Sequence, residues 1–156
     1  KTDDFLPLYK LIINNMCNRT TAHNGTVNLK LLGLVSAVDQ SNAVILYGAG
    51  TVGNITKEFL KYNGFENKIL GFATSTANKE IEVDGTVVKN IKNYQDNTNA
   101  LVIVSARESY HKEMIGILQE THFHKYCCID YELEAEIEKE IYNKSILQKG
   151  LLLDIR

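Results

Sequence analysis

The sequence has 156 residues, of which 44% are hydrophobic and 23% are charged, which is the composition of one ordinary globular domain. Its 17 Lys and Arg residues against 19 Asp and Glu residues give a net charge of -2 without a basic stripe, which argues against nucleic-acid binding. No apolar run approaches the ~18 residues that a membrane-spanning helix needs, and the start shows no signal peptide.

Residues 1–42 predict a helical segment that precedes the main fold. Apolar residues recur at three- and four-residue spacings on both sides of a polar stretch at 18–26, which indicates two helices joined by a loop. The chain starts with Lys1 and ends on an apolar stretch, so we expect it to be one module of a longer protein.

The next segment predicts a buried strand followed by a glycine-rich turn and a helix. The continuous apolar run at 43–47 is typical of a central parallel strand that is covered on both faces. The glycine loop that follows it reads Gly48-Ala49-Gly50-Thr51-Val52-Gly53. Apolar residues at helical spacing then continue to Asn63-Gly64, where Gly64 is well placed to end a helix.

The rest of the chain alternates between strand and helix patterns. We predict strands at 68–73, 86–88, 100–104 and 126–130, and helices at 107–121 and 132–149. Asp84-Gly85 forms a turn before the strand at 86–88, and residues 94–99 form a polar bridge. This alternation predicts an α/β fold, a Rossmann-like parallel sheet flanked by helices, with an N-terminal helical pair and a C-terminal helix.

Three segments are expected on this basis. Residues 1–42 are the N-terminal helical segment, residues 43–130 the Rossmann-like nucleotide-binding domain, and residues 131–156 a C-terminal helix and tail that lead toward a further domain.

The glycine loop is the strongest functional signal because it stands between a buried strand and a helix. Gly48 allows the tight turn, Gly50 lets phosphates approach the backbone, and Gly53 lets helix and strand pack closely. Free N–H groups near Thr51 and Val52 at the helix start, together with the helix dipole, favour a pyrophosphate. The alternative is that the glycines serve packing only.

The end of the second strand separates the candidate ligands. An NAD site normally offers an acidic residue there to hold the ribose hydroxyls, whereas this sequence has Thr74 and Ser75, and the nearest acids are Glu66 and Glu80. No Arg follows that could receive a 2′-phosphate. Hydroxyls can still bond a ribose or sugar, so Thr74 and Ser75 are candidate ligand contacts, with capping of a loop as the alternative.

The end of the fourth strand forms the predicted far wall of the site. Ser105 and Arg107 follow that strand, and Arg107 could bind a phosphate, or it could simply be solvated. For His111 we favour a structural role over acid–base chemistry. The sequence identifies no catalytic residue, and we predict no metal site at His122–Cys128, because the potential ligands crowd into seven residues.

Four segments together resemble a known family. They are the glycine loop with its strand at 44–53, the Ile-Leu-Gly-Phe strand at 69–72, the Asp-Gly turn and strand at 83–88, and the apolar strand at 100–104. They resemble the Rossmann-like nucleotide-sugar-binding domains of bacterial surface-polysaccharide enzymes, including the N-terminal domains of sugar O-acyltransferases and of polysaccharide-biosynthesis sugar dehydratases. The resemblance implies a binding module and transfers no catalytic residue, since no hexapeptide repeat of an acyltransferase domain follows.

These observations define the functional expectations. We expect a nucleotide- or nucleotide-sugar-binding accessory module of a glycosyltransferase or sugar-modifying enzyme, with NAD(P) as the second choice of ligand and no catalysis of its own. The alternatives are the cofactor domain of an NAD(P)-dependent oxidoreductase or epimerase, and a purely structural module. Three cysteines, Cys17, Cys127 and Cys128, are an odd count that favours reduced thiols in a cytoplasmic protein. A homodimer through the C-terminal or N-terminal helices is an alternative to a monomer.

Overall fold

The computed structural model describes residues 29–154, with the side chains of the last helix described to residue 147. The strands are β1 Val44–Tyr47, β2 Ile69–Thr74, β3 Ile81–Val83, β4 Thr86–Asn90, β5 Leu101–Val104 and β6 Tyr126–Cys128. The α-helices are α2 Leu29–Asp39, α3 Thr51–Tyr62, α4 His111–Glu120 and α5 Tyr131–Asp154. Three short 3-10 helices complete the set: η1 Glu66–Lys68, η2 Ile91–Asn97 and η3 Glu108–Tyr110.

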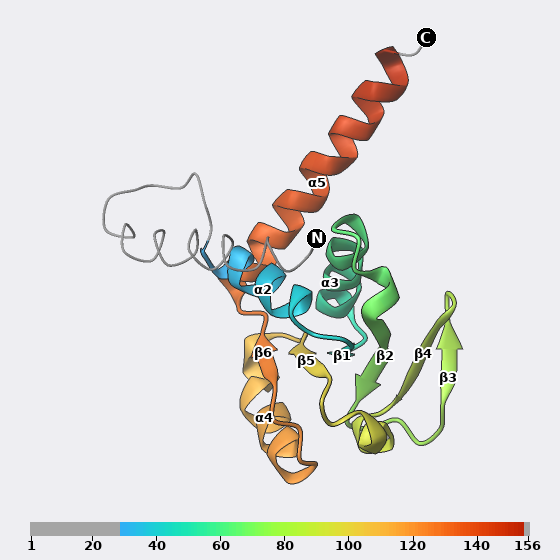
Figure 1. The fold of residues 1–156 in the computed structure, drawn as a ribbon, viewed down its shortest axis with the longest axis vertical. Coiled ribbons are helices and arrows are strands. Elements are labelled where there is room, and N and C mark those ends of the chain that lie inside the picture. The colour runs from blue at the N-terminus through green and yellow to red at the C-terminus, as the bar shows by residue number, and fades with distance from the viewer. Residues whose placement is uncertain (1–28, 155–156) are drawn as a thin grey trace.

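The strands form one mixed sheet in the order β3-β4-β2-β1-β5-β6, flanked by helices on both faces (Figure 1). Five of the strands are parallel, and β3 pairs antiparallel with β4 at the edge. Numbered along the chain, the parallel strands run 3-2-1-4-5, which is the strand order of a Rossmann-like fold. The predicted fold class is therefore confirmed.

Two apolar layers hold the helices to the sheet. All four residues of β1 and all four of β5 are buried, as predicted for strands that are covered on both faces. Val44 and Leu46 face the layer that α2, α3 and α5 cover, and Ile45 and Tyr47 face the layer of α4 and η2. The alternation of consecutive side chains between the two layers fixes the register of the central strands.

One strand was not expected from the sequence. β3 follows β2 as a three-residue strand, and its turn at Asp84 and Gly85 returns the chain into β4. All three residues of β3, Ile81, Glu82 and Val83, are exposed. The strand therefore has no buried side, and no hydrophobic pattern in the sequence predicts it. As a result the chain passes from β2 to β4 through an edge strand instead of the helix of a regular parallel crossover.

The segment predicted as a polar bridge contains a buried tyrosine, Tyr94. Tyr94 lies within η2, is 2% exposed, and donates a hydrogen bond of 2.9 Å from its hydroxyl to the Phe72 carbonyl. Gly71 makes room for it, since a Cβ at that position would lie 2.6 Å from the Tyr94 hydroxyl. Through this contact, η2 packs against the sheet at β2.

The remaining elements agree with the expectations apart from small shifts. The helix predicted at 107–121 begins as η3 and continues as α4, and the strand predicted at 126–130 is β6. α2 is the second of the two N-terminal helices that the sequence predicts, while the first helix and Cys17 fall outside the described residues.

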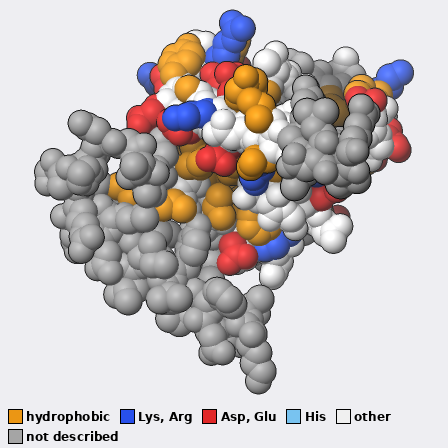
Figure 2. Space-filling view, turned by 90° about the horizontal axis from the view of Figure 1, so that it is seen from above, with side chains coloured by type: hydrophobic (Ala, Val, Ile, Leu, Met, Phe, Trp, Pro, Cys, Tyr) orange, Lys and Arg blue, Asp and Glu red, His pale blue; other side chains and the backbone are white. Residues whose placement is uncertain are grey.

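Charged and hydrophobic side chains are mixed on the described part of the face seen in Figure 2. In the view of Figure 2, acidic and basic side chains lie interspersed among hydrophobic ones. Within residues 29–154, no helix combines the length and the hydropathy that crossing a membrane requires.

Candidate functional site

The glycine loop lies where the strand order of the sheet reverses, between β1 and β5, at the carboxyl ends of the parallel strands. In open α/β sheets ligands bind outside this edge at such a reversal. Gly48 has a φ of +123°, and its N–H donates a 2.8 Å bond to the Ala73 carbonyl. The loop is thus joined to the end of β2 as it leaves β1.

Two glycines of the loop are required by close packing. A Cβ on Gly48 would lie 2.4 Å from the carbonyl oxygen of Ser105. A Cβ on Gly53 would lie 2.0 Å from the carbonyl oxygen of Gly48, which is backbone and cannot move aside like a flexible side chain. These contacts match the roles predicted for Gly48 and Gly53, a tight turn and a close approach of helix and strand.

Gly50 is different. Its φ of -86° is open to any residue, and a Cβ there would meet no heavy atom of the described residues within 4 Å. Packing within the chain therefore does not explain a glycine at this position. The space beside Gly50 is open, at the residue that directly precedes α3.

The loop carbonyls are turned toward the protein. The Ser105 hydroxyl donates to the Gly48 carbonyl at 3.2 Å, and the Asn54 side-chain amide donates to the carbonyls of Ala49 and Gly50 at 3.3 and 2.8 Å. The first helical bond runs from the Asn54 N–H to the Gly50 carbonyl at 3.0 Å, and no side chain in the described part of the chain caps the helix start. The N–H groups of residues 51–53 therefore belong to the unpaired first turn of α3.

The hydroxyls at the end of β2 are used to hold a loop. The Thr74 hydroxyl accepts a 3.1 Å bond from the Ala77 N–H, and the Ser75 hydroxyl bonds to the hydroxyl of Tyr47. The Asn90 amide donates to the carbonyls of Ser75 and Ala77 at 3.3 and 3.2 Å. Both hydroxyls thus border the carboxyl edge in a fixed loop, and their contact with a ribose stays a prediction.

Tyr47, the last residue of β1, is fully buried and supports the end of β2 from within the fold through its bond to Ser75. Burial raises the pKa of Tyr47, the bond to Ser75 lowers it in part, and the negative charge of Glu113 raises it further. The phenol is therefore neutral at physiological pH, and its hydroxyl is bonded to Ser75 inside the fold.

The two residues predicted for the far wall differ, because Ser105 is buried and Arg107 is exposed. Ser105 is 1% exposed, and its N–H and hydroxyl both donate to the Tyr47 carbonyl, at 2.9 and 3.3 Å, so it braces the loop from behind. Arg107 is exposed directly before η3, and the ion pairs found among the described residues do not involve it. Its predicted contact with a phosphate is untested.

Sequence reasoning missed three residues that shape the site, Tyr47, Asn54 and Asn90. Asn54 follows Gly50 by four residues on a helix, which is the spacing at which a side chain can reach back to a loop carbonyl. Tyr47 and Asn90 meet partners 28 and 15 residues away in the sequence, and no local pattern reveals such pairs.

The histidine and cysteine positions have structural surroundings. The ring Nε2 of His111 lies 2.7 Å from the Ala106 carbonyl, in keeping with the structural role favoured for it. Cys127 and Cys128 are free thiols whose side chains join opposite apolar layers. Among the described residues, no group of three or more His, Cys, Asp or Glu side chains could hold a metal ion.

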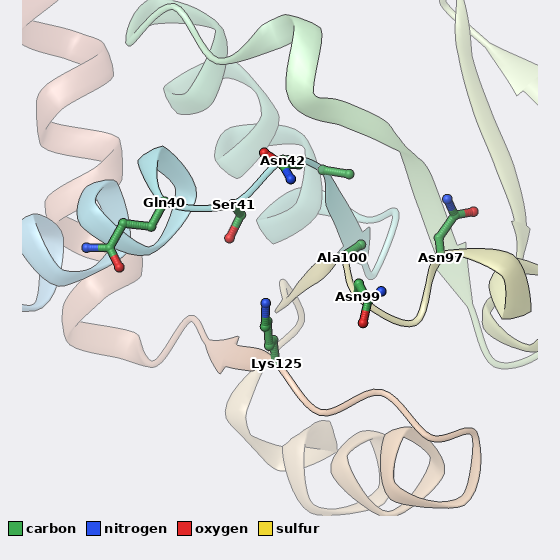
Figure 3. Close-up of a pocket in the computed structure, with 8 residues that line it drawn as sticks. Gln40, Ser41, Asn42, Asn97, Asn99, Ala100 and Lys125 are labelled. Atoms are coloured by element: carbon green, nitrogen blue, oxygen red, sulfur yellow. The ribbon is translucent and has the colours of Figure 1, made fainter. Parts of the chain in front are cut away.

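A hollow of about 370 Å³ lies at the opposite, amino edge of the sheet (Figure 3). Half of its eight lining residues carry amide side chains, and Figure 3 shows the Lys125 ammonium pointing toward Ser41 and Asn42. Lys68 fixes this edge by donating to the carbonyls of Val38, Asp39 and Ser41 at 3.1, 2.8 and 2.9 Å. The hollow is remote from the glycine loop, at the edge where open α/β sheets do not bind their ligands.

No protein-family model matches the sequence, and no curated protein does. Two similar solved structures are of RSP. One, in complex with β-NADH, has a TM-score of 0.48 and 11% identity over 97% of this chain and 95% of that chain. The other, of RSP as a Rex-family repressor, has a TM-score of 0.48 and 10% identity over 93% and 94%. The fold assignment itself rests on the strand order and register of this chain.

Proposed function

We propose that this chain binds a nucleotide through its diphosphate, at the glycine loop between β1 and α3. The observation that carries the proposal is the open space at Gly50 beside an uncapped helix start. Packing explains Gly48 and Gly53, but it gives no reason for a glycine at position 50. A phosphate that approaches the backbone does give one, because it needs the space that a side chain would fill.

The local electrostatics support an anionic ligand. The carbonyls of residues 48–50 accept bonds from Ser105 and Asn54, so their negative ends are directed at the protein's own donors. The unpaired amides of residues 51–53 and the positive end of the α3 dipole then offer a site for two phosphate groups. Arg107 is exposed beyond the neighbouring strand and is our candidate for a further phosphate contact.

For the rest of the ligand we propose a nucleotide-sugar first and NAD(P) second. The end of β2 offers Thr74 and Ser75 and has no carboxylate, so the acidic ribose contact of a typical NAD site is missing. The hydroxyls of these two residues keep lone pairs that could accept bonds from a sugar. We further propose, from the sequence resemblance, that the chain is an accessory module of a surface-polysaccharide enzyme and contributes no catalytic residue.

The test is a binding screen with matched glycine variants. UDP-sugars, CDP-sugars, NAD(H) and NADP(H) are titrated into the protein by calorimetry, and at least one diphosphate ligand is expected to bind. Gly50→Ala should weaken that binding by about tenfold or more, because the new methyl group occupies the space of the phosphate. Its free energy of unfolding should stay within about 0.5 kcal/mol of wild type, since the entropic gain offsets a slightly poorer cap.

Gly116→Ala is the control, because a Cβ at Gly116 in α4 also meets open space. It should leave binding unchanged. If no diphosphate ligand binds at millimolar concentration, the proposal is wrong. If one binds equally well to Gly50→Ala and wild type, the glycine loop is not where it binds.

A further inference from the structure

Asn54 lies just beyond the first turn of α3 and bonds back to the glycine loop. Its side-chain Nδ2 donates to the Gly50 carbonyl at 2.8 Å and to the Ala49 carbonyl at 3.3 Å. The Gly50 carbonyl also accepts the backbone N–H of Asn54 at 3.0 Å, which is the ordinary first bond of a helix. The bonds found among the described residues give the Ala49 carbonyl no other partner. The orientation of this carbonyl therefore depends on the Asn54 side chain.

The direction of each loop carbonyl also sets the direction of the N–H group that follows it. In a planar trans peptide the C=O and the N–H point in opposite directions. Because the Ala49 carbonyl is held toward Asn54, the N–H of Gly50 points away from Asn54. The same holds for the Gly50 carbonyl and the N–H of Thr51. Within residues 29–154 neither N–H group donates to an acceptor, so both are left for a ligand.

The peptide between Ala49 and Gly50 is the one in the loop that can turn over. Before it, the Gly48 carbonyl is held by the buried Ser105 hydroxyl at 3.2 Å, and after it Thr51 already belongs to the helix. Gly50 has open space beside it and the conformational freedom of a glycine. Rotation of this peptide would turn the Ala49 carbonyl outward and the Gly50 N–H inward, and an outward carbonyl oxygen repels a phosphate.

Helix formation does not explain an asparagine at position 54. Asparagine is a weaker helix former than alanine or leucine, because its side chain competes for backbone groups. Asn54 is exposed, so burial does not hold its side chain either. At the opposite end of α3, Asn63 makes a similar bond, from its side-chain amide to the Phe59 carbonyl at 2.7 Å. The same chemistry thus occurs once beside the loop and once away from it.

We propose that Asn54 is a positioning residue for the diphosphate. Its side chain keeps the Ala49–Gly50 peptide in the orientation that presents the Gly50 N–H to the ligand, and it acts through the backbone without touching the phosphate itself. The inference rests on the proposed function, because it concerns the same site. A peptide that is already oriented does not have to be turned over when the ligand binds, so less of the interaction free energy is lost.

The test is an NMR titration of the isotope-labelled chain with inorganic pyrophosphate at constant ionic strength. In wild type, pyrophosphate should shift the N–H signals of Gly50 and Thr51. Asn54→Leu has nearly the same side-chain shape and no donor, and it should bind pyrophosphate about fivefold more weakly or worse. Before any pyrophosphate is added, the Gly50 signal of this variant should already be broadened or doubled, since its peptide samples both orientations.

Two further variants separate positioning from simple stabilisation of the helix. Asn63→Leu is the matched control, because it removes a similar bond from the far end of α3, and it should bind pyrophosphate like wild type. Asn54→Thr keeps a single hydroxyl donor, which can bond the carbonyl four residues earlier, as Thr56 does to the Val52 carbonyl at 2.7 Å. The Ala49 carbonyl is then left unpaired, so this variant should bind as weakly as Asn54→Leu.

Wild-type affinity in Asn54→Leu or in Asn54→Thr overturns the inference, and so does an equal loss of affinity in Asn63→Leu. In each of these cases the proposed function stands, because wild type still binds pyrophosphate at the loop. If millimolar pyrophosphate leaves the signals of residues 49–53 in wild type unchanged, the inference is also overturned, and the screen with nucleotides decides the proposed function separately.

Discussion

α3 follows β1 and α5 follows β6 at the carboxyl edge of the sheet, and the first turns of these two helices are completed differently. At α5 the Asp130 carboxylate accepts a 2.8 Å bond from the Leu133 N–H, and the Glu108 carboxylate accepts a 2.9 Å bond from the Tyr131 N–H. At α3 the cap residue is Gly50, which has no side chain to offer. The protein supplies carboxylates to the first turn of α5 and no capping side chain among the described residues to that of α3, where we propose that a phosphate binds.

The third helical residue differs as well. In α5 it is Leu133, which is 5% exposed and packs in the apolar layer, so this helix stands off from the sheet by a side chain. In α3 it is Gly53, directly against the Gly48 carbonyl. The contrast shows that α3 is placed so that its first turn reaches the strand end, whereas α5 is placed by its hydrophobic contacts.

The largest effect is expected from adding a side chain where α3 meets its strand. In Gly53→Ala the new methyl group would have to lie 2.0 Å from a backbone oxygen, so helix and strand must separate. We expect a loss of about 3 kcal/mol or more in the free energy of unfolding, measured by urea denaturation. Gly116→Ala, in open space within α4, should instead be neutral or slightly stabilising. A Gly53→Ala protein as stable as wild type would show that the close approach is wrong.

A second change makes the start of α3 resemble that of α5. Gly50→Asp places a carboxylate at the cap position, where it can accept a bond from the first turn. We expect the free energy of unfolding to rise by about 0.5 kcal/mol, while the affinity for a diphosphate ligand falls by more than about tenfold through repulsion and loss of space. Gly50→Asn, a neutral cap of the same size, separates the two causes in calorimetry. Full binding by Gly50→Asp would contradict an anion site at α3.

The converse change removes the cap of α5. Asp130 also pairs with Lys30 of α2 at 2.6 Å, and Lys30 reaches Glu132 at 2.9 Å, so the cap links two helices far apart in the sequence. Asp130→Ala should lower the free energy of unfolding by about 1 kcal/mol in urea denaturation, since cap and ion pair are both lost. Ligand binding at α3 should not change, and a change would mean that the two helix starts are coupled.

The smallest effect is the pH dependence of that cap. The bond from Lys30 and the bond from the Leu133 N–H lower the pKa of Asp130 from its ordinary value of 3.8. The stabilisation is therefore complete above the unfolded value and is lost as the pH falls through the lower, folded value. Asp130→Asn keeps a cap without the charge, so between pH 7 and pH 2 its stability should fall by about 0.5 kcal/mol less than that of wild type. Equal slopes would contradict this account.

Much of the fold could be predicted because its central strands are covered on both faces. The apolar runs at 43–47 and 100–104 correspond to β1 Val44–Tyr47 and β5 Leu101–Val104, and each is followed by the turn and helix that the pattern indicates. β3 could not be predicted, since a three-residue exposed strand has no buried side to create a pattern. Tyr94 was assigned to a polar bridge because its partner, the Phe72 carbonyl, lies 22 residues away.

The residues of the candidate site also fall into a group that local sequence predicts and a group that it does not. Local chain geometry accounts for Gly48 and Gly53, so the glycine spacing was enough to predict their roles. The bond between Tyr47 and Ser75 and the contacts of Asn90 depend on how separate strands end beside each other. Such contacts exist only once the sheet is assembled, and no spacing in the sequence encodes them.

The adjacent free cysteines of β6, Cys127 and Cys128, can report on local opening of this strand. β6 is an edge strand, and burial, together with the smaller effect of the neighbouring Cys128, raises the pKa of Cys127 to about 12. At neutral pH the Cys127 thiol is therefore protonated and inert toward alkylating reagents while the strand is in place. The rate at which Cys127 is alkylated, followed by mass spectrometry, would measure how often β6 opens locally while the rest of the molecule stays folded.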